Sequence, residues 1–501
     1  MQEFDVIVVG AGNAALAAAV SARDSGARKV LVLEKAPREA RGGNTHFSGG
    51  IFRFAFDRIE QAIDLVPNLD EGWPEFRTGA DPYPARDFHS DLMRVTGGQS
   101  DPELANLIIS NSYPLMQWMR DVAKMPFEPA RAFGGEAVKG KDSLEGVRTG
   151  MGVRWQPGVI IRAVGQGKGL SKAWFAAAQN HDIEVRYDAC VLRLAQSDAG
   201  RVNGVVVRGA DGIRTIHARS VVLGCGGFEA NVAWRVQYLG GHWGQARVRG
   251  CAFNHGDGLR MALDIGAVAN GDWDGCHATP VSLDSPVYAD LVNTDKTNRL
   301  SYEFGVMLNR EGRRFLDEGY DHHSMTYALY GGLVLAEPGG VAFQIFDSKV
   351  LHLLEGRYAT SKPLTADTLE GLIAQLPIDR QQAIKTLNEF NAAAGHGTFH
   401  PTELNGQHTE GIAPPKTNWA QKLDTPPYVC YPVTGGITFT FGGIKVNERA
   451  EVVGNNWKPI PGLYSCGEMV GGIFHGNYPA GTGLTSGAVM GRIAGASAAT
   501  I

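Results

Sequence analysis

The hydrophobic positions at the start of the chain form short, uninterrupted runs that alternate with a helix-like segment. Residues 6–9 read Val-Ile-Val-Val, an apolar run that predicts a strand buried on both faces. A glycine turn follows, and then an alanine-rich stretch over residues 13–22 that favours a helix. A second apolar run, Val-Leu-Val-Leu at residues 30–33, predicts the next strand. The pattern therefore predicts a strand, a tight turn, a helix and a second, parallel strand.

The turn after the first strand carries its glycines at the spacing of a phosphate-binding turn. Glycines there let the backbone approach a pyrophosphate, Ala15 stands at the third glycine position, and Glu34 ends the second strand where an acid contacts an adenosine ribose. We therefore predict dinucleotide binding, with an ordinary tight turn as the alternative. The predicted contacts here are Gly10, Gly12, Asn13, Ala14, Ala15, Glu34 and Lys35.

Farther along, the pattern changes and then returns. A helix is expected from Leu170, followed by a strand at residues 183–195 and a hairpin at 202–223 that ends in a second glycine turn. The glycine-rich stretch 134–152 is expected to be a surface loop or hairpin. The middle of the chain has less strand–helix alternation and more His, Tyr, Asp and Pro, and an amphipathic helix is expected at 379–394.

After this middle part, the sequence again predicts strands followed by a helix of small residues, as in the first part of the chain. We therefore predict an α/β (α+β) fold in which a discontinuous Rossmann-like domain, residues 1–271 and 435–501, carries an inserted domain, residues 272–434. The length of 501 residues agrees with two domains, because it exceeds what a single core usually holds.

Composition narrows the class of function. The 47 basic and 52 acidic residues give a mild negative charge, which argues against nucleic acid or an anionic membrane as the main partner and favours a small-molecule substrate. The six cysteines show no metal-binding spacing, so we predict no metal and a reducing, cytoplasmic setting. The N-terminal apolar run is short and interrupted, so neither a signal peptide nor direct membrane insertion is expected.

Three further motifs carry a family resemblance. They are Ala-Arg-Gly-Gly-Asn-Thr-His-Phe-Ser-Gly-Gly at residues 40–50, Gly-Arg-Arg-Phe-Leu-Asp-Glu-Gly at 312–319 and Gly-Leu-Tyr-Ser-Cys-Gly-Glu-Met-Val-Gly-Gly at 462–472. Together they resemble the flavoprotein subunit family of fumarate reductase and succinate dehydrogenase, which is similar to the 3-ketosteroid dehydrogenases. Within that family the chain resembles the tricarballylate dehydrogenases. The resemblance implies an FAD-binding domain with an inserted capping domain.

The resemblance also implies which residues contact FAD. Asn44 stands where relatives with covalently attached flavin have a histidine, so non-covalent FAD is expected. Glu468 is expected to reach a ribityl or ribose hydroxyl, with a turn-capping carboxylate as the alternative. The implied contacts, in addition to those of the first turn, are Arg41, Gly42, Gly43, Asn44, Thr45, Ser48, Gly49, Gly50, Cys190, Val191, Gly226, Gly227, Asp257, Gly467, Glu468, Gly483, Leu484 and Thr485.

The family chemistry adds or removes hydrogen across a carbon–carbon bond next to a carbonyl or carboxylate, with hydride transfer to or from flavin N5. In fumarate reductases the acid is an arginine eight residues after the arginine of the Arg-Phe-x-x-Glu motif; counting from Arg314 reaches His322, beside His323. With Tyr320 and Tyr327 these histidines form the predicted base cluster, because histidine titrates near neutral pH. A solvated histidine pair on the surface is the alternative.

Two more residues are predicted to act on the substrate. His277 stands where relatives use a histidine to hold a carboxylate, and Tyr478 stands in Asn-Tyr-Pro-Ala-Gly-Thr-Gly, which resembles the ketone-polarising element of ketosteroid dehydrogenases. A buried structural histidine and a core aromatic residue are the respective alternatives.

We therefore expect an FAD-dependent dehydrogenase of a small carboxylate or ketone, tricarballylate being the leading candidate. A desaturase of cyclic ketones or 3-ketosteroids is the first alternative. An electron-transfer subunit that passes electrons to a membrane partner is the alternative from another class, and an electron-acceptor protein is a candidate partner in either case.

Overall fold

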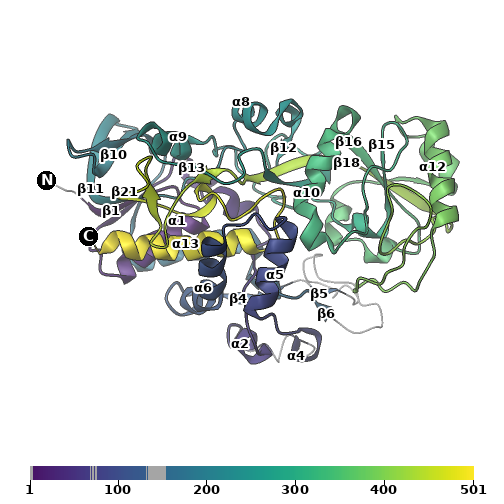
Figure 1. Cartoon of the computed structure of the whole chain (residues 1–501), viewed down its shortest axis with the longest axis horizontal. Coiled ribbons are helices and arrows are strands. Elements are labelled where there is room, and N and C mark those ends of the chain that lie inside the picture. The colour runs from purple at the N-terminus through teal and green to yellow at the C-terminus, as the bar shows by residue number, and fades with distance from the viewer. Residues whose placement is uncertain are drawn as a thin grey trace.

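The computed structural model describes residues 4–67, 69, 73, 76–130, 132–133 and 154–500. The chain forms two lobes that lie side by side, each with a β-sheet at its centre (Figure 1). The first lobe contains the two ends of the described chain, and the second lobe is built from its middle. The stretch 134–152, for which a loop or hairpin is expected, lies outside the described residues.

The sheet of the first lobe has the parallel centre that the apolar runs predict. β1 (Phe4–Val9) lies between β2 (Val30–Leu33) and β11 (Gly212–Leu223), so that Val6 pairs with Val30 on one side and with Ser220 on the other. The apolar residues of β1 and β2 are buried, as strands covered on both faces require. The predicted α/β class and the Rossmann-like first domain are confirmed.

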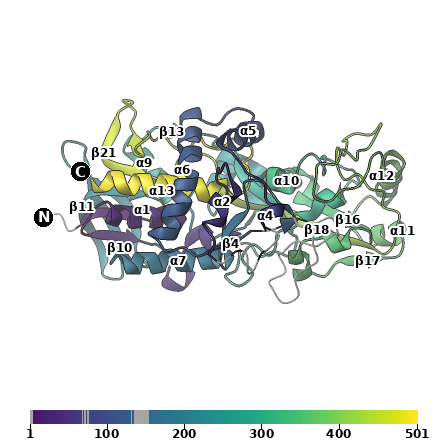
Figure 2. The same ribbon diagram turned by 90° about the horizontal axis from the view of Figure 1, so that it is seen from below.

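Two long helices cover this sheet and pack unusually closely. α1 (Asn13–Asp24) and α13 (Thr482–Ala499) run side by side in both views of the ribbon (Figures 1 and 2). The approach depends on small residues, because a Cβ atom at Gly491 or Gly495 would overlap the carbonyl oxygens of Ala14 or Ala18. Segments almost 500 residues apart therefore form one unit.

The helix expected from Leu170 is present, but its predicted start is wrong. α7 runs from Gln166 to Asn180 and so begins four residues earlier than expected. Its first turn contains Gly167, whose hydrogen faces the carbonyl oxygens of Thr45 and Ser48 closely enough that a Cβ atom would not fit. The glycines that resemble a loop in the sequence are in fact needed for a tightly packed helix start.

The single strand expected at 183–195 is divided into β8, which pairs with β2, and β9; the expected hairpin is present as β10 and β11, which pair antiparallel, and β9 pairs with β10. Their bounds, with those of the smaller elements, are β3 (Ile51–Phe52), β4 (Phe127–Pro129), β5 (Ala132–Phe133), β6 (Arg154–Trp155), β7 (Ile161–Ala163), β8 (Glu184–Arg186), β9 (Cys190–Gln196), β10 (Val202–Gly209), β13 (Ala269–Asn270), β19 (Gly443–Ile444), β20 (Glu451–Val453), β21 (Pro459–Ser465), α2 (Ile59–Ile63), α4 (Phe76–Gly79), α5 (Ala85–Val95), α6 (Pro102–Asp121), α8 (Val232–Trp234) and α9 (Asp257–Asp264).

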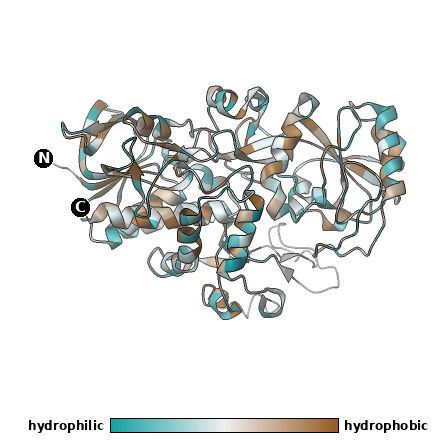
Figure 3. Ribbon diagram, viewed as in Figure 1, coloured by the Kyte–Doolittle hydropathy of each residue, from teal (hydrophilic) through white to brown (hydrophobic). Residues whose placement is uncertain are grey.

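The second lobe is organised around one long strand, β18 (Tyr428–Thr440), which pairs antiparallel with β14 (Cys276–Ser282), β16 (Val341–Phe346) and β17 (Leu364–Ala366). β15 (Val306–Asn309) continues the sheet beyond β16. Helix α10 (His323–Ala336) packs on β14 and β18, and α11 (Leu369–Ile373) and α12 (Arg380–Ala393) lie at the far end. Figure 3 shows hydrophobic residues concentrated on the strands of both lobes, with many hydrophilic residues on α12.

The sheet of the second lobe extends past the domain boundaries predicted from the sequence. β12 (Arg247–Val248), which precedes residue 272, pairs in parallel with residues 436 and 437 of β18, and β18 itself continues through residue 434 to Thr440. The division at 271/272 and 434/435 stays a prediction. In space, residues 435–440 connect the second sheet to the first lobe.

Within the described part of the chain, none of the helices combines the length and the apolar character that crossing a bilayer would require.

Candidate active site

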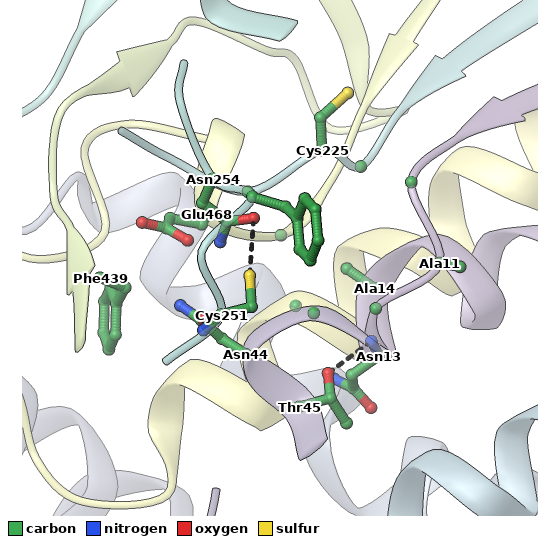
Figure 4. Close-up of a pocket in the computed structure, with 18 of the residues that line it drawn as sticks. Ala11, Asn13, Ala14, Asn44, Thr45, Cys225, Cys251, Asn254, Phe439 and Glu468 are labelled. Atoms are coloured by element: carbon green, nitrogen blue, oxygen red, sulfur yellow. Dashed lines mark hydrogen bonds between the residues drawn. The ribbon is translucent and has the colours of Figure 1, made fainter. Parts of the chain in front are cut away.

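A large cavity lies at the carboxyl ends of β1, β2 and β11, where ligands bind in open α/β sheets. It contains about 1520 Å³ of space, part of it open to solvent. Its wall is formed by segments from the whole length of the first lobe together with His277 of the second lobe. Figure 4 shows Ala11 and Ala14 on one side, Asn44 and Thr45 below, and Phe439 and Glu468 opposite.

The turn after β1 has the geometry of a phosphate cradle. Gly10 has a φ of +102°, and a Cβ atom at this residue would overlap the backbone of Gly224. Gly12 precedes the first turn of α1, whose unpaired amides and positive dipole end favour an anion. Thr45 fixes this end of the helix, because its Oγ1 accepts a hydrogen bond of 2.8 Å from the Asn13 amide (Figure 4).

Glu34 occupies the position predicted for a ribose contact. It follows β2, lines the cavity and accepts a hydrogen bond of 2.8 Å from the amide of Ala36. Burial raises the pKa of its carboxyl group. Beside it, Lys35 forms an ion pair of 2.5 Å with Asp257, which also lines the cavity. A polar rim therefore surrounds this end of the cavity.

A network of buried amides and acids lies deeper in the wall. Glu229 Oε1 accepts hydrogen bonds from Asn44 (2.6 Å) and Asn254 (2.5 Å), and Glu468 accepts one of 2.7 Å from the amide of Thr440. Burial raises the pKa of both glutamates, and the proximity of the Glu229 carboxyl raises that of Glu468 further. Sequence reasoning missed Glu229 and Asn254, since no motif connects them to Asn44.

Most of the predicted cofactor contacts lie together on the cavity wall. These are Gly10, Gly12, Asn13, Ala14, Glu34, Lys35, Gly43, Asn44, Thr45, Ser48, Val191, Gly226, Asp257, Gly467, Glu468, Gly483 and Leu484. The other predicted contacts are not among the described residues that line the cavity. They are Ala15, Arg41, Gly42, Gly49, Gly50, Cys190, Gly227 and Thr485. Their contact with a cofactor stays a prediction.

Several of these other residues support the wall from behind. Ala15 packs against Gly224, where an added Cβ atom would overlap it. Arg41 donates a hydrogen bond of 2.8 Å to the hydroxyl of Tyr187 and lies over the ring of Phe175. Thr485 donates through its hydroxyl to the carbonyl oxygen of Arg53. The side chains thus hold the segments of the cavity in place.

Two of the predicted catalytic residues meet at the far end of the cavity. His277 and Tyr478 both line it, with ring centroids 4.9 Å apart, and the Tyr478 hydroxyl is hydrogen-bonded to the hydroxyl of Tyr327 on α10. Burial raises the pKa of both tyrosines. Burial, and then the Arg249 charge, lower the pKa of His277 well below its ordinary value, which favours a neutral imidazole.

Arg249, which was not predicted from the sequence, lies at the same end of the cavity as His277 and Tyr478. It lines the cavity, is 8% exposed, and donates from Nε to the Thr438 hydroxyl at 2.8 Å. One terminal nitrogen lies 3.5 Å from His277 Nε2. The sequence around it matches no catalytic pattern, so only the fold reveals it.

Of the predicted base cluster, Tyr327 meets Tyr478 at the end of the cavity, and the structure places the other three residues elsewhere in the second lobe. His323 begins α10, and its Nδ1 lies 3.0 Å from the buried carboxylate of Glu303; its neighbour His322 packs against Trp419. Tyr320 is 64% exposed. Among the described residues that line the cavity, none of these three is present. Their catalytic role stays a prediction.

The residues of the cavity suit FAD. The glycine cradle leaves no room for side chains at the α1 end, Glu34 stands where a ribose is contacted, and the opposite end is lined by aromatic rings. His46, the histidine of the 40–50 motif, lies half-buried with Nε2 3.4 Å from the Leu291 carbonyl oxygen, while Asn44 lines the cavity. This placement favours non-covalent FAD, which stays a prediction.

Comparison with known proteins agrees with this assignment. The FAD binding domain family model matches residues 5–484. A fumarate reductase (cytochrome) from Shewanella frigidimarina is 28% identical over 99% of this chain and 77% of its own length. A 4-oxocyclohexanecarboxylate 2-dehydrogenase from Sinomonas cyclohexanicum is 28% identical over 97% of this chain and 91% of its own length.

A solved structure shows the same fold. The 3-ketosteroid-Δ4-(5α)-dehydrogenase from Rhodococcus jostii RHA1, in complex with 4-androstene-3,17-dione, superposes with a TM-score of 0.73 at 22% identity, covering 100% of this chain and 98% of that one. The chain therefore belongs to the FAD binding domain family, as a relative of the fumarate reductase flavoproteins and the 3-ketosteroid dehydrogenases, and is an FAD-dependent oxidoreductase.

Proposed function

We propose that this protein is an FAD-dependent dehydrogenase that forms, or in reverse reduces, a carbon–carbon double bond next to a carboxylate or ketone of a small substrate. The observation that carries the proposal is the far end of the cavity, where His277, Tyr478 and its hydrogen-bonded partner Tyr327 meet. Such a reaction needs a hydride acceptor and a group that takes a proton from the neighbouring carbon.

When bound, FAD supplies the hydride acceptor. The chain's own residues would hold it: the turn after β1 binds the pyrophosphate, Glu34 contacts the ribose, and the first turn of α13, with Gly483 and Leu484 on the wall, directs positive potential into the cavity. Phe439 and Phe474 surround Tyr478, with ring centroids 5.2 and 5.3 Å from it, and exclude water from this end.

Side chains at the His277 end of the cavity can transfer the proton. Tyr478 lines the cavity and can donate its phenolic proton to a carbonyl oxygen, while Tyr327 hydrogen-bonds it from α10 and can return a proton. In the direction that forms the double bond, the neutral imidazole of His277 can accept the proton released by the neighbouring carbon, while Tyr478 hydrogen-bonds the carbonyl oxygen. We keep His322 and His323 as the alternative base cluster.

Tricarballylate or a similar small polycarboxylate is our first candidate substrate, on the motifs that suggested it. A specific observation favours a second candidate, a cyclic ketone: the Tyr327–Tyr478 hydroxyl pair points a polarised phenol into an aromatic-lined cavity. The relative named for a cyclic oxo acid supports it. We also propose a cytoplasmic location, which the six free thiols support.

The test is anaerobic bleaching of the bound flavin. We expect its long-wavelength absorption band to disappear on mixing with a member of a panel containing tricarballylate, 4-oxocyclohexanecarboxylate, cyclohexanone and a 3-ketosteroid. Bleaching by tricarballylate but by none of the ketones would reject the second candidate. Absence of bleaching by any compound, with rapid reduction by an electron-transfer protein, would reject the dehydrogenase and favour an electron-transfer subunit.

The base is tested separately. Single His322→Ala and His323→Ala variants should slow flavin reduction by about 100-fold or more at whichever histidine removes the proton. Unchanged rates in both variants, with slow reduction in Tyr478→Phe, would assign the proton transfer to the end of the cavity that contains His277.

A further inference from the structure

We propose that Arg249 binds a carboxylate group of the substrate and so selects anionic substrates over neutral ketones. This inference rests on the proposed function and names the substrate class of the same site. It begins from the position of Arg249, which directly follows β12 and whose amide donates a hydrogen bond of 2.7 Å to the carbonyl oxygen of Ile437 in β18. The backbone is therefore fixed on both sides of the residue.

The guanidinium group of Arg249 has few protein acceptors for a buried cation. Nε donates to Thr438 Oγ1 at 2.8 Å, and a terminal nitrogen lies 3.5 Å from His277 Nε2. Among the described residues, no carboxylate forms an ion pair with it. A buried charge is costly unless an opposite charge or several hydrogen bonds compensate it.

Three other buried arginines, Arg314, Arg357 and Arg299, are compensated by the protein. Arg314 forms an ion pair of 2.5 Å with Glu318, and Arg357 lies 3.1 Å from a carboxylate oxygen of Glu355. Arg299 donates instead to three carbonyl oxygens and to the hydroxyls of Thr360 and Ser361. Arg249 differs from these because its remaining donors line a cavity.

Two acidic residues, Glu468 on the cavity wall and Glu229 behind it, do not fill this role. Glu229 already accepts hydrogen bonds from Asn44 and Asn254, and Glu468 accepts them from the amide and hydroxyl of Thr440. Burial raises the pKa of both, which favours their protonated forms. The partner of Arg249 must therefore come from outside the described protein.

A carboxylate is the group that fits. The planar guanidinium matches its two oxygens, and the pairing is strong where water is excluded. A substrate held there by its carboxylate lies beside His277 and Tyr478, the groups proposed to act on it. A bound cofactor carbonyl is the competing partner, and the experiment separates the two.

The experiment measures ligand binding separately from flavin reduction, as the spectral change of the oxidised flavin that precedes any bleaching. We would titrate the oxidised holoenzyme with 4-oxocyclohexanecarboxylate, its methyl ester, tricarballylate, succinate and cyclohexanone, and follow the change in the flavin absorption spectrum. The variants are Arg249→Met and Arg249→Lys. The control is Arg247→Met, which removes a half-buried arginine two residues away that does not line the described cavity wall.

We expect Arg249→Met to weaken binding of the acid by about 10- to 100-fold, as for loss of hydrogen bonds to a charged group, and binding of the ester by less than about 2-fold. Arg249→Lys, which keeps the charge, should lie between Arg249→Met and the wild type, and Arg247→Met should equal the wild type. The FAD content and the flavin reduction potential should stay unchanged.

Equal losses for acid and ester would overturn the inference, since Arg249 would then only support the fold. A shifted flavin potential without discrimination between acid and ester would overturn it in favour of a cofactor contact. Binding of cyclohexanone but of no carboxylate would overturn it and leave the proposed function standing. If no compound binds or bleaches the flavin, the inference and the proposed function both fail.

Discussion

At the scale of single residues, two acids, Glu468 on the cavity wall and Glu229 behind it, have a measurable consequence. Glu229 accepts hydrogen bonds from the side-chain amides of Asn44 and Asn254, Glu468 accepts them from Thr440, and burial raises the pKa of both carboxyl groups above the ordinary value. In the folded apoprotein they hold protons that the unfolded chain has already released. The contribution of these two groups to stability is therefore greatest below the ordinary carboxyl pKa and is lost as pH rises through their raised pKa.

We therefore predict that Glu468→Gln makes the free energy of unfolding of the apoprotein less sensitive to pH between about pH 5 and about pH 8, because glutamine has no proton to lose. Denaturant unfolding at several pH values measures this. Glu448→Gln, at an exposed position, is the control and should keep the wild-type slope. An unchanged slope in Glu468→Gln would show that this carboxyl is ionised in the folded protein.

The hydroxyl of Tyr478 gives a second prediction at this scale. Tyr478→Phe keeps the ring packing against His277 and Phe439 but removes the hydrogen bond to Tyr327. Flavin reduction by a substrate should slow by about 100-fold or more, as for loss of a group that transfers a proton. Stopped-flow absorbance measures the rate, with Tyr428→Phe in the second lobe as the control. A rate within about 2-fold of the wild type would remove Tyr478 from the mechanism.

Residues that belong to one local motif could be predicted from the sequence, and residues brought together by the fold could not. Gly10, Gly12 and Glu34 lie within one strand–helix–strand unit, so their spacing alone indicates their role. Arg249 and Glu229 each meet partners from distant segments, and the residue types around them match no pattern. Their role depends on their burial and on which hydrogen-bond partners the fold brings to them, and only the folded structure shows these.

At the scale of elements, the contact between α1 and α13 supports the cavity. Both helices contribute residues to its wall from their first turns, and the glycines of α13 let the backbones approach. We predict that Gly491→Ala destabilises the protein by about 1–3 kcal/mol, because the new Cβ atom overlaps the Ala14 carbonyl oxygen and forces the helices apart.

The same change should weaken FAD binding, since Ala14 lines the cavity. Thermal unfolding and fluorescence titration with FAD measure the two effects. Ser497→Ala, a half-buried position of the same helix, is the control and should change neither. A stable Gly491→Ala variant with normal FAD affinity would show that the helices can separate without cost.

Element types were predictable and element ends were less so. The apolar runs of β1 and β2 and the amphipathic pattern of α12 indicated strand and helix correctly. The start of α7 was missed because glycines near Gly167 resemble a loop, whereas close packing against Thr45 and Ser48 requires them. Propensity describes the isolated chain, and tertiary packing overrides it.

At the scale of the whole molecule, the far end of the second lobe has a hydrophobic core separate from that of the first lobe. One cluster contains residues of β1, α1 and α13, and another contains residues of β15, β16 and α12. Since the cavity lies almost wholly in the first lobe, we predict that FAD at about 100 times its dissociation constant stabilises that lobe by about 2.7 kcal/mol.

Hydrogen exchange should therefore slow by about 100-fold at amides of α1 and α13 when FAD is added, and should change little in α12. Mass spectrometry of the corresponding peptides, with and without FAD, measures this. Equal protection of α12 would mean that the two lobes unfold as one cooperative unit.

The two-part organisation could be anticipated from the change in composition along the chain, but the way the parts join could not. No residue pattern indicates that β12 and the end of β18 continue one sheet into the other lobe, because pairing partners lie almost 200 residues apart. Long-range strand register is a property of the folded chain.

The continuity of β18 has a practical consequence for building chimeras. Its first half pairs with β16 and β17, and its last residues include Thr438, Phe439 and Thr440 on the cavity wall. A graft that exchanges the inserted segment at residue 434 would cut this strand in two and leave the donor's substrate-facing surface attached to the recipient's wall. Transplants that carry residues 247–282 and 428–440 together would keep β12, β14 and β18 paired, with Arg249, His277 and Thr438 in their places on the cavity wall.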